Sequence, residues 1–147
     1  MKIDITTGDV ITPKEIEYLY PCMFQEKSLR VLAYSLEMIL AEKYESVIKR
    51  NITTTRMRDF YDLYNLYNLR KEDINFDILK QAIISTARRR ESLSLMKQAI
   101  EIIEDIKEDD YLKELWTVYL ADNLYVGDLN FSETVKVIEI IADKIAL

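Results

Sequence analysis

Three short segments carry charge at positions where a helix or strand would otherwise bury apolar side chains. They are Lys2-Ile3-Asp4-Ile5, Leu40-Ala41-Glu42-Lys43 and the run from Arg56 to Leu63. Burying a charged side chain is costly unless it is paired or opens into a polar cleft. The residue types suit phosphate binding by lysine and arginine and cation binding by carboxylate oxygens. These segments are therefore the candidates for a functional site.

The amino-acid composition limits the chemistry that the chain can perform. There is no histidine and only one cysteine, Cys22. This excludes Ser/His and Cys/His nucleophilic sites, histidine metal ligands, cysteine-built zinc sites and an intramolecular disulfide. Any catalysis must use carboxylates, lysine or a hard cation such as Mg²⁺. The sequence shows neither a signal-peptide pattern nor an apolar run of about 18 residues, so we expect a cytoplasmic protein with no membrane partner.

The net charge of −6 is unevenly distributed along the chain. Between Lys43 and Arg58 there are five cations and a single acid, Glu45. Between Glu101 and Glu114 there are seven acids and two lysines. One end of the protein is therefore expected to attract phosphate while the other end repels it.

The predicted fold class is α+β, mostly α, with a short antiparallel β ribbon followed by a bundle of about five helices. Alternating apolar residues in the first 34 positions predict the ribbon, which we expect to be the edge of a larger sheet whose other strands lie upstream. Ser35 is a credible N-cap, and residues 35–147 are predicted to form a helical domain. Helices are expected at about 35–50, 55–69, 77–90, 94–107, 109–125 and 132–146.

Lys43 shares one helical face with Leu36, Leu40 and Val47. One interpretation is that its aliphatic stem packs on the core while the ammonium reaches water. The other is that the ammonium lies at the rim of a cleft and binds phosphate. The sequence alone leaves both open.

Asp59 and Asp62 lie on a helix that is apolar nearly all round and is therefore predicted to be central. Such carboxylates need partners, and Arg58 stands four residues before Asp62, while Lys43 or Arg50 could reach across from the preceding helix. The result would be a buried ion-pair network between two helices. The same network could orient Lys43 and Arg58 toward a nucleotide.

Two further candidates have weaker local support. Asp4 alternates with Ile3 and Ile5, a pattern typical of the solvent face of a strand, and one carboxylate cannot hold the metal ions of nucleotidyl transfer without partners. Arg88-Arg89-Arg90 is predicted to be a solvated helix end.

The first half of the chain resembles the AbiEii/AbiGii-type nucleotidyltransferase toxins of bacterial abortive-infection, phage-defence systems. Three features match: the Lys-Ile-Asp-Ile strand at residues 2–5 followed by residues 7–13, the Leu-Ala-Glu-Lys segment at residues 40–43, and the run from Arg56 to Asp62. The resemblance implies an MNT-like enzyme whose palm domain binds NTP and Mg²⁺ and is followed by a helical domain. It also implies a toxin that transfers nucleotides to RNA, particularly tRNA, and is restrained by a cognate antitoxin.

The resemblance assigns a role to five residues. Asp4 matches the third catalytic and metal-binding carboxylate of the palm. Lys43 matches the helix lysine near the nucleotide. Arg58, Asp59 and Asp62 match the Arg/Lys-Asp-x-x-Asp motif, in which the family more often has lysine where Arg58 stands. The resemblance thus implies that Lys43, Asp59 and Asp62 are catalytic together with Asp4, and that Lys43 and Arg58 bind the nucleotide.

The chain lacks the Gly-Ser loop and Asp-x-Asp that carry the other two carboxylates in this family. We therefore expect a C-terminal portion of such a toxin that supplies Lys43 and Arg58 but does not catalyse alone, with Mg²⁺ and NTP bound only by the complete enzyme. The alternative is a helical interaction module that binds an antitoxin or partner subunit and has no chemistry. An exposed ribbon edge or aromatic surface predicts a homodimer.

Overall fold

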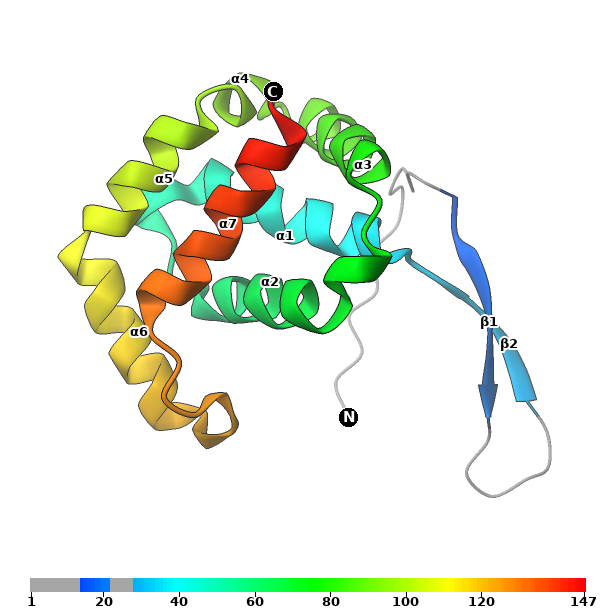
Figure 1. The fold of residues 1–147 in the computed structure, drawn as a ribbon, viewed down its shortest axis with the longest axis horizontal. Coiled ribbons are helices and arrows are strands. Elements are labelled where there is room, and N and C mark those ends of the chain that lie inside the picture. Colours follow the sequence, from blue (N-terminus) through cyan, green and yellow to red (C-terminus); the bar gives the residue numbers. More distant parts are fainter. Residues whose placement is uncertain (1–13, 22–27) are drawn as a thin grey trace.

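The computed structural model describes residues 14–21 and 28–147. A two-stranded antiparallel hairpin, β1 (Ile16–Pro21) and β2 (Ser28–Ala33), projects from a helical body (Figure 1). This arrangement confirms the predicted α+β, mostly α fold class. The strand predicted around Asp4 lies outside the described residues.

The body contains seven α-helices within the described range, where a bundle of about five and six helical ranges were predicted. The seventh arises because the range predicted at 94–107 is interrupted by a turn at Lys97 and Gln98. The helices are α1 (Leu36–Arg50), α2 (Met57–Arg70), α3 (Phe76–Arg89), α4 (Leu93–Met96), α5 (Ala99–Glu108), α6 (Asp110–Asp122) and α7 (Phe131–Ile145). Short 3-10 turns occupy Asn51–Thr53, Lys71–Asp73 and Leu124–Val126. None of the described helices is long and apolar enough to cross a membrane.

Side-chain caps fix where several helices begin. The Ser35 hydroxyl accepts a hydrogen bond from the Met38 amide at 3.2 Å, which confirms the predicted N-cap of α1. The Asp109 carboxylate accepts from the Leu112 amide at 2.8 Å and starts α6. Each cap satisfies an amide that the first helical turn leaves without a partner.

The core lies where α1 packs against α2 and α3 and where α7 crosses α2 and α5 (Figure 1). Aromatic rings join these layers: Phe60 of α2 lies 5.2 Å from Phe131 of α7, and Trp116 of α6 lies 5.9 Å from Phe131, centroid to centroid. The Trp116 indole donates a hydrogen bond to the Leu129 carbonyl at 2.8 Å. The indole is therefore both buried and satisfied.

The helix α2 is less enclosed than its apolar sequence predicts. It contacts α1, α6 and α7, but only Met57, Phe60 and Leu63 are buried. Residues 64–67 are half-buried, and Leu69 near its end is 70% exposed. The helix is therefore packed against its neighbours without being enclosed on all sides.

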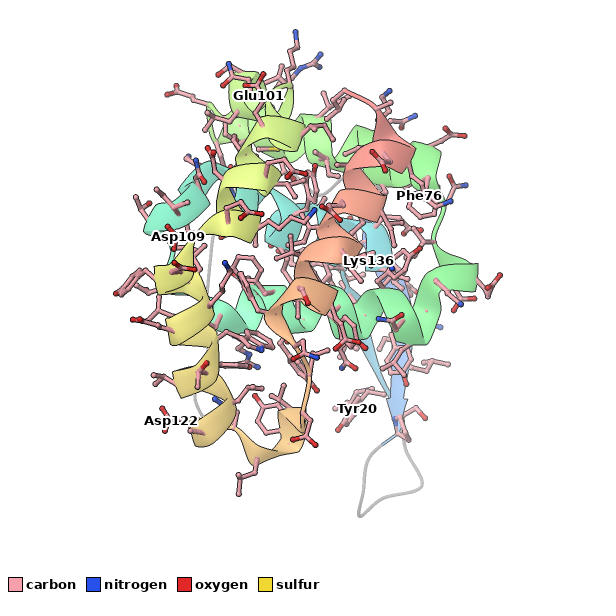
Figure 2. The ribbon with its side chains drawn as sticks, turned by 60° about the vertical axis from the view of Figure 1, so that its left-hand side comes forward. Tyr20, Phe76, Glu101, Asp109, Asp122 and Lys136 are labelled. Atoms are coloured by element: carbon pink, nitrogen blue, oxygen red, sulfur yellow. The ribbon has the colours of Figure 1, made fainter. Side chains whose placement is uncertain are left out.

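The hairpin presents an apolar face that no described residue covers. The strand register places Tyr18 opposite Val31 and Tyr20 opposite Leu29, and all four side chains are exposed, from 39% for Val31 to 58% for Leu29. Figure 2 shows Tyr20 on the strand that extends beyond the helices. The opposite face is mixed, with an exposed pair between Glu17 and Arg30 at 4.0 Å.

Acidic residues gather on α5 and α6, as their sequence predicts. Glu101, Asp109 and Asp122 lie along one side of the molecule (Figure 2). Glu101 and Asp122 are exposed, and Asp109 is half-buried. This confirms that the acidic stretch beginning at Glu101 forms a solvated surface.

A buried carboxylate ties α1 to the end of α3. The Glu45 side chain is 1% exposed and accepts hydrogen bonds from Arg90 Nη1 at 2.8 Å and from the Ser92 hydroxyl at 2.6 Å. Both of its oxygens are therefore satisfied. Such a pair is costly to break because the remaining partner keeps a buried, uncompensated group.

A second buried polar group has no partner within the protein. Tyr44 is fully buried in the core, and its hydroxyl forms no hydrogen bond with any described residue. Burial, with a smaller contribution from the charge of Asp143, raises the pKa of Tyr44 above its ordinary value of 10.0. The ring stabilises the core while the hydroxyl does not.

Replacing Glu45 should destabilise the fold in a graded way. We expect Glu45→Ala to lower the free energy of unfolding by about 2 kcal/mol, because Arg90 is one-third exposed and part of the charge cost is relieved by water. Glu45→Gln keeps the size and part of the hydrogen bonding and should cost about 1 kcal/mol. Urea unfolding monitored by circular dichroism measures both values. A loss below about 0.5 kcal/mol for Glu45→Ala would contradict this role.

Removing the Tyr44 hydroxyl should be neutral or stabilising. Tyr44→Phe is expected to raise the free energy of unfolding by up to about 1 kcal/mol at neutral pH. Because the folded-state pKa exceeds the unfolded-state value, only the unfolded chain releases this proton as the pH rises past 10.0, so the wild type loses stability there. Tyr44→Phe should lose less over the same range. A variant less stable than the wild type at neutral pH would show that the hydroxyl has a partner.

Candidate functional site

The structure brings three of the predicted site residues together between α1 and α2. The Lys43 Nζ atom lies 2.6 Å from Asp62 Oδ2 and 3.4 Å from Asp59 Oδ1. The three side chains are between 15% and 23% exposed. We refer to Lys43, Asp59 and Asp62 as the lysine–aspartate cluster.

Helical spacing explains this geometry. Residues three apart on a helix are neighbours on its surface, so Asp59 and Asp62 present two carboxylates to the same partner helix. Lys43 is on the side of α1 that faces α2, next to Ser46, whose hydroxyl donates to Asp59 Oδ2 at 3.3 Å. The ammonium is therefore held by groups on a neighbouring helix as well as by its own stem.

Arg58 forms the outer edge of this cluster. Its Nε atom lies 3.7 Å from Asp62 Oδ2, too far for a hydrogen bond but within ion-pair distance, and its side chain is 79% exposed. Asp62 thus lies between the ammonium of Lys43 and the guanidinium of Arg58. Most of the Arg58 donors remain available to a ligand.

Two members of the lysine–aspartate cluster line a surface cleft of about 310 Å³. Lys43 and Asp59 line this cleft together with Tyr34, Ile39, Glu42, Ser46, Arg56 and Arg90. The ion-pair network and the cleft position considered from the sequence therefore occur together. The two carboxylates balance the charges of Lys43 and Arg58, and the ammonium, which has three donors, keeps one for a ligand.

The Asp4 prediction lies outside the described residues. Within residues 14–21 and 28–147, no three carboxylate or cysteine side chains converge to hold a metal ion. Asp59 and Asp62 already accept from Lys43, so they do not form a magnesium site as they stand.

The prediction of a solvated helix end is wrong for Arg89 and Arg90 and holds for Arg88, which is exposed. Arg89 Nη2 and Arg90 Nη2 lie 3.6 Å and 3.5 Å from Glu42 Oε1, and Arg90 also binds buried Glu45. The physical reason is that α3 packs along α1, so the end of α3 meets acids that are more than 40 residues earlier in the chain.

Sequence reasoning also missed Arg56 and Arg90 as part of the cleft that contains Lys43. Arg56 precedes the motif by two residues and was noted only for its charge. Arg90 could have been found only from the packing of α1 against α3, since no local pattern connects it with Lys43.

Comparison with known proteins gives one match. A family model described as nucleotidyl transferase AbiEii toxin, Type IV toxin–antitoxin system, matches residues 1–144. Searches of curated proteins and of solved structures found no match. The matched range includes the lysine–aspartate cluster, Arg58 and Asp4. Because the match extends over nearly the whole chain, the protein belongs to the AbiEii family of nucleotidyltransferase toxins.

Proposed function

We propose that this chain supplies phosphate-contacting residues to the nucleotidyl-transfer site of a toxin, with Lys43 and Arg58 in that role. The observation that carries the proposal is the position of the Lys43 ammonium, fixed 2.6 Å from Asp62 at the rim of a cleft and retaining one donor. A charge held in this way needs little reorganisation when a phosphate arrives.

In nucleotidyl transfer a hydroxyl oxygen of the acceptor attacks the α-phosphorus of an NTP. A new P–O bond forms, the bond to pyrophosphate breaks, and negative charge develops on the phosphoryl oxygens. Lys43 and Arg58 would bind those oxygens. Asp59 and Asp62 would act as positioning residues in this proposal, because both accept hydrogen bonds from the Lys43 ammonium and hold it in place.

Magnesium would neutralise the phosphates and activate the attacking oxygen in the complete enzyme. We propose Asp4 as the one carboxylate of this chain that contributes to its binding. The remaining carboxylates would come from outside the chain, since its sequence has no Gly-Ser loop followed by Asp-x-Asp. This chain alone is then expected to bind neither Mg²⁺ nor NTP productively.

The same proposal divides the chain into a part of the palm sheet and a helical domain. Residues 1–34 would be part of the palm sheet and residues 35–147 the helical domain, which agrees with an apolar hairpin face left uncovered by the helices. Membership in a toxin–antitoxin family implies an antitoxin partner. An RNA acceptor such as tRNA, a role in phage defence, a cytoplasmic location and a homodimer stay predictions.

One alternative function has an observation in its favour. The exposed apolar hairpin face could bind a partner protein directly, since contiguous apolar surface often marks an interface. In that case the chain would be an interaction module for an antitoxin or partner subunit, and the lysine–aspartate cluster would only stabilise the packing of α1 on α2.

Complementation separates the two functions. We expect the chain alone to give no Mg²⁺-dependent labelling of cellular RNA with any radiolabelled NTP, and labelling to appear when the N-terminal catalytic region of an intact AbiEii homologue is added. The physical reason is that the missing carboxylates would then be present. Gel electrophoresis of the RNA measures the transfer. No labelling in the mixture, with stable association of the two pieces, would favour the interaction module.

Lys43→Gln should remove activity in the complemented assay without unfolding the protein. We expect labelling to fall at least about 100-fold, since one charge-stabilising donor is lost, and the free energy of unfolding to fall by no more than about 1 kcal/mol because the side chain is partly exposed. Asp62→Asn should raise KM for the nucleotide with a smaller effect on kcat.

Lys80→Gln is the matched control for Lys43→Gln, because the Lys80 ammonium binds only the Ala146 carbonyl at 2.9 Å among the described residues. It makes the same charge change away from the cleft and should leave labelling unchanged. Equal losses for Lys43→Gln and Lys80→Gln would rule out the assigned role of Lys43.

A further inference from the structure

A second cleft, of about 560 Å³, adjoins the one that contains Lys43. The two share Ser46, Arg56 and Arg90 as walls. The remaining residues that line the second cleft are Glu45, Lys49, Arg50 and Thr53. We refer to this second space as the basic cleft.

The basic cleft concentrates positive charge in a protein whose net charge is −6. Four cationic side chains line it against one acid, Glu45. A hollow lined by charge of one sign raises the local concentration of counter-ions more than a flat surface does. The cleft therefore favours an anion although the protein as a whole does not.

Two of the cations are held in place. The Lys49 ammonium donates to the Arg90 carbonyl at 2.7 Å, and the Arg90 guanidinium donates to Glu45 at 2.8 Å. The buried carboxylate thus fixes Arg90, and the Arg90 backbone fixes Lys49. Ligand binding loses less side-chain entropy when the binding groups are already ordered.

The other two cations have no acidic partner. Neither Arg50 nor Arg56 forms an ion pair with any residue of the described chain, and both are exposed. Guanidinium groups offer paired donors that match the geometry of phosphoryl oxygens. Arg50 and Arg56 are therefore available to bind such oxygens.

The remaining groups of the cleft disfavour recognition of a base. Its lining has no aromatic side chain on which a base could stack. The hydroxyls of Ser46 and Thr53 already donate to Asp59 and to the Arg50 carbonyl. The remaining groups are charged donors, which bind phosphate oxygens and do not distinguish one base from another.

We propose that the basic cleft is a binding site for phosphoryl oxyanions, separate from the contacts assigned to Lys43 and Arg58, with Arg50 and Arg56 as the ligand-binding residues and Lys49 and Arg90 as its fixed walls. The oxyanions belong either to the phosphodiester backbone of a nucleic acid strand or to the polyphosphate of a nucleotide. Binding of the oxyanion needs no nucleotidyl transfer. Only the interpretation of the bound phosphate as part of a substrate of that reaction rests on the proposed function.

Binding to the full 147-residue chain tests the site directly. Fluorescence anisotropy with labelled oligo(U) and oligo(A) RNA of about 12 nucleotides reports the phosphodiester source. Isothermal titration calorimetry with inorganic tripolyphosphate reports the polyphosphate source, and its competition with the labelled RNA shows whether the two ligands share the cleft. The double variant Arg50→Gln/Arg56→Gln should weaken binding at least about tenfold near 0.1 M salt and, because two phosphate contacts are lost, reduce the magnitude of the salt slope of log affinity by about 1.4. The double lysine variant, which keeps both charges, should recover most of the affinity.

Arg88→Gln is the matched control, because Arg88 is exposed near the same end of α3 but does not line the basic cleft. It should leave affinity and salt slope unchanged. Tripolyphosphate binding without oligonucleotide binding would assign the cleft to a nucleotide, and oligonucleotide binding that tripolyphosphate displaces only weakly would assign it to a strand.

Three results would overturn the site: no binding of either probe, an equal loss for Arg88→Gln, or more than about a tenfold preference between oligo(A) and oligo(U). A failure of RNA labelling in the complemented enzyme leaves this binding result intact. Loss of binding by the arginine variants likewise leaves the test of Lys43 intact, so the two proposals fail separately.

Discussion

The need to pair the charged side chains on the enclosed flanks of α1 shapes the arrangement of the helices around it. The helices α2 and α3 pack against α1. On the side of α1 that faces the core, Leu40, Tyr44 and Ile48 are fully buried. Charges on its flanks therefore cannot all reach bulk water. Lys43 is neutralised by carboxylates from α2, and Glu45 is neutralised by Arg90 at the end of α3. The same ion pairs that allow α1 to be enclosed also fix its neighbours relative to one another.

The two adjoining clefts differ in how their charge is balanced. In the lysine–aspartate cluster two carboxylates neutralise the Lys43 ammonium, so its attraction for a distant anion is weak. The ammonium still offers one donor in a fixed orientation. In the basic cleft Arg50 and Arg56 form no ion pair with any described residue, so their charges are less balanced and attract an anion more strongly. In these proposals Lys43 would orient a bound phosphate, and Arg50 and Arg56 would attract it. Such a division of roles would suit a ligand with several phosphates.

Local patterns predicted the elements well, because caps and helical periodicity act over a few residues. The start of α1 at Ser35 and the pairing of β1 with β2 follow from such signals. The pairing of Lys43 with Asp62 was also among the predicted alternatives, since both residues stood at positions that would otherwise be apolar. The site at Arg90 was not predicted, because it depends on packing between α1 and α3 that no nearby sequence encodes. The partial exposure of α2 was missed for a related reason: its tyrosines resemble core residues in sequence and are only half-buried in the structure.

The hairpin face that no described residue covers has a consequence for solubility. Exposed apolar surface and unpaired strand edges promote aggregation between chains. The helical core among the described residues begins at Met38 and receives no side chain from the two strands. Covering the hairpin face would therefore change the solubility of the protein more than the thermodynamic stability of its helices.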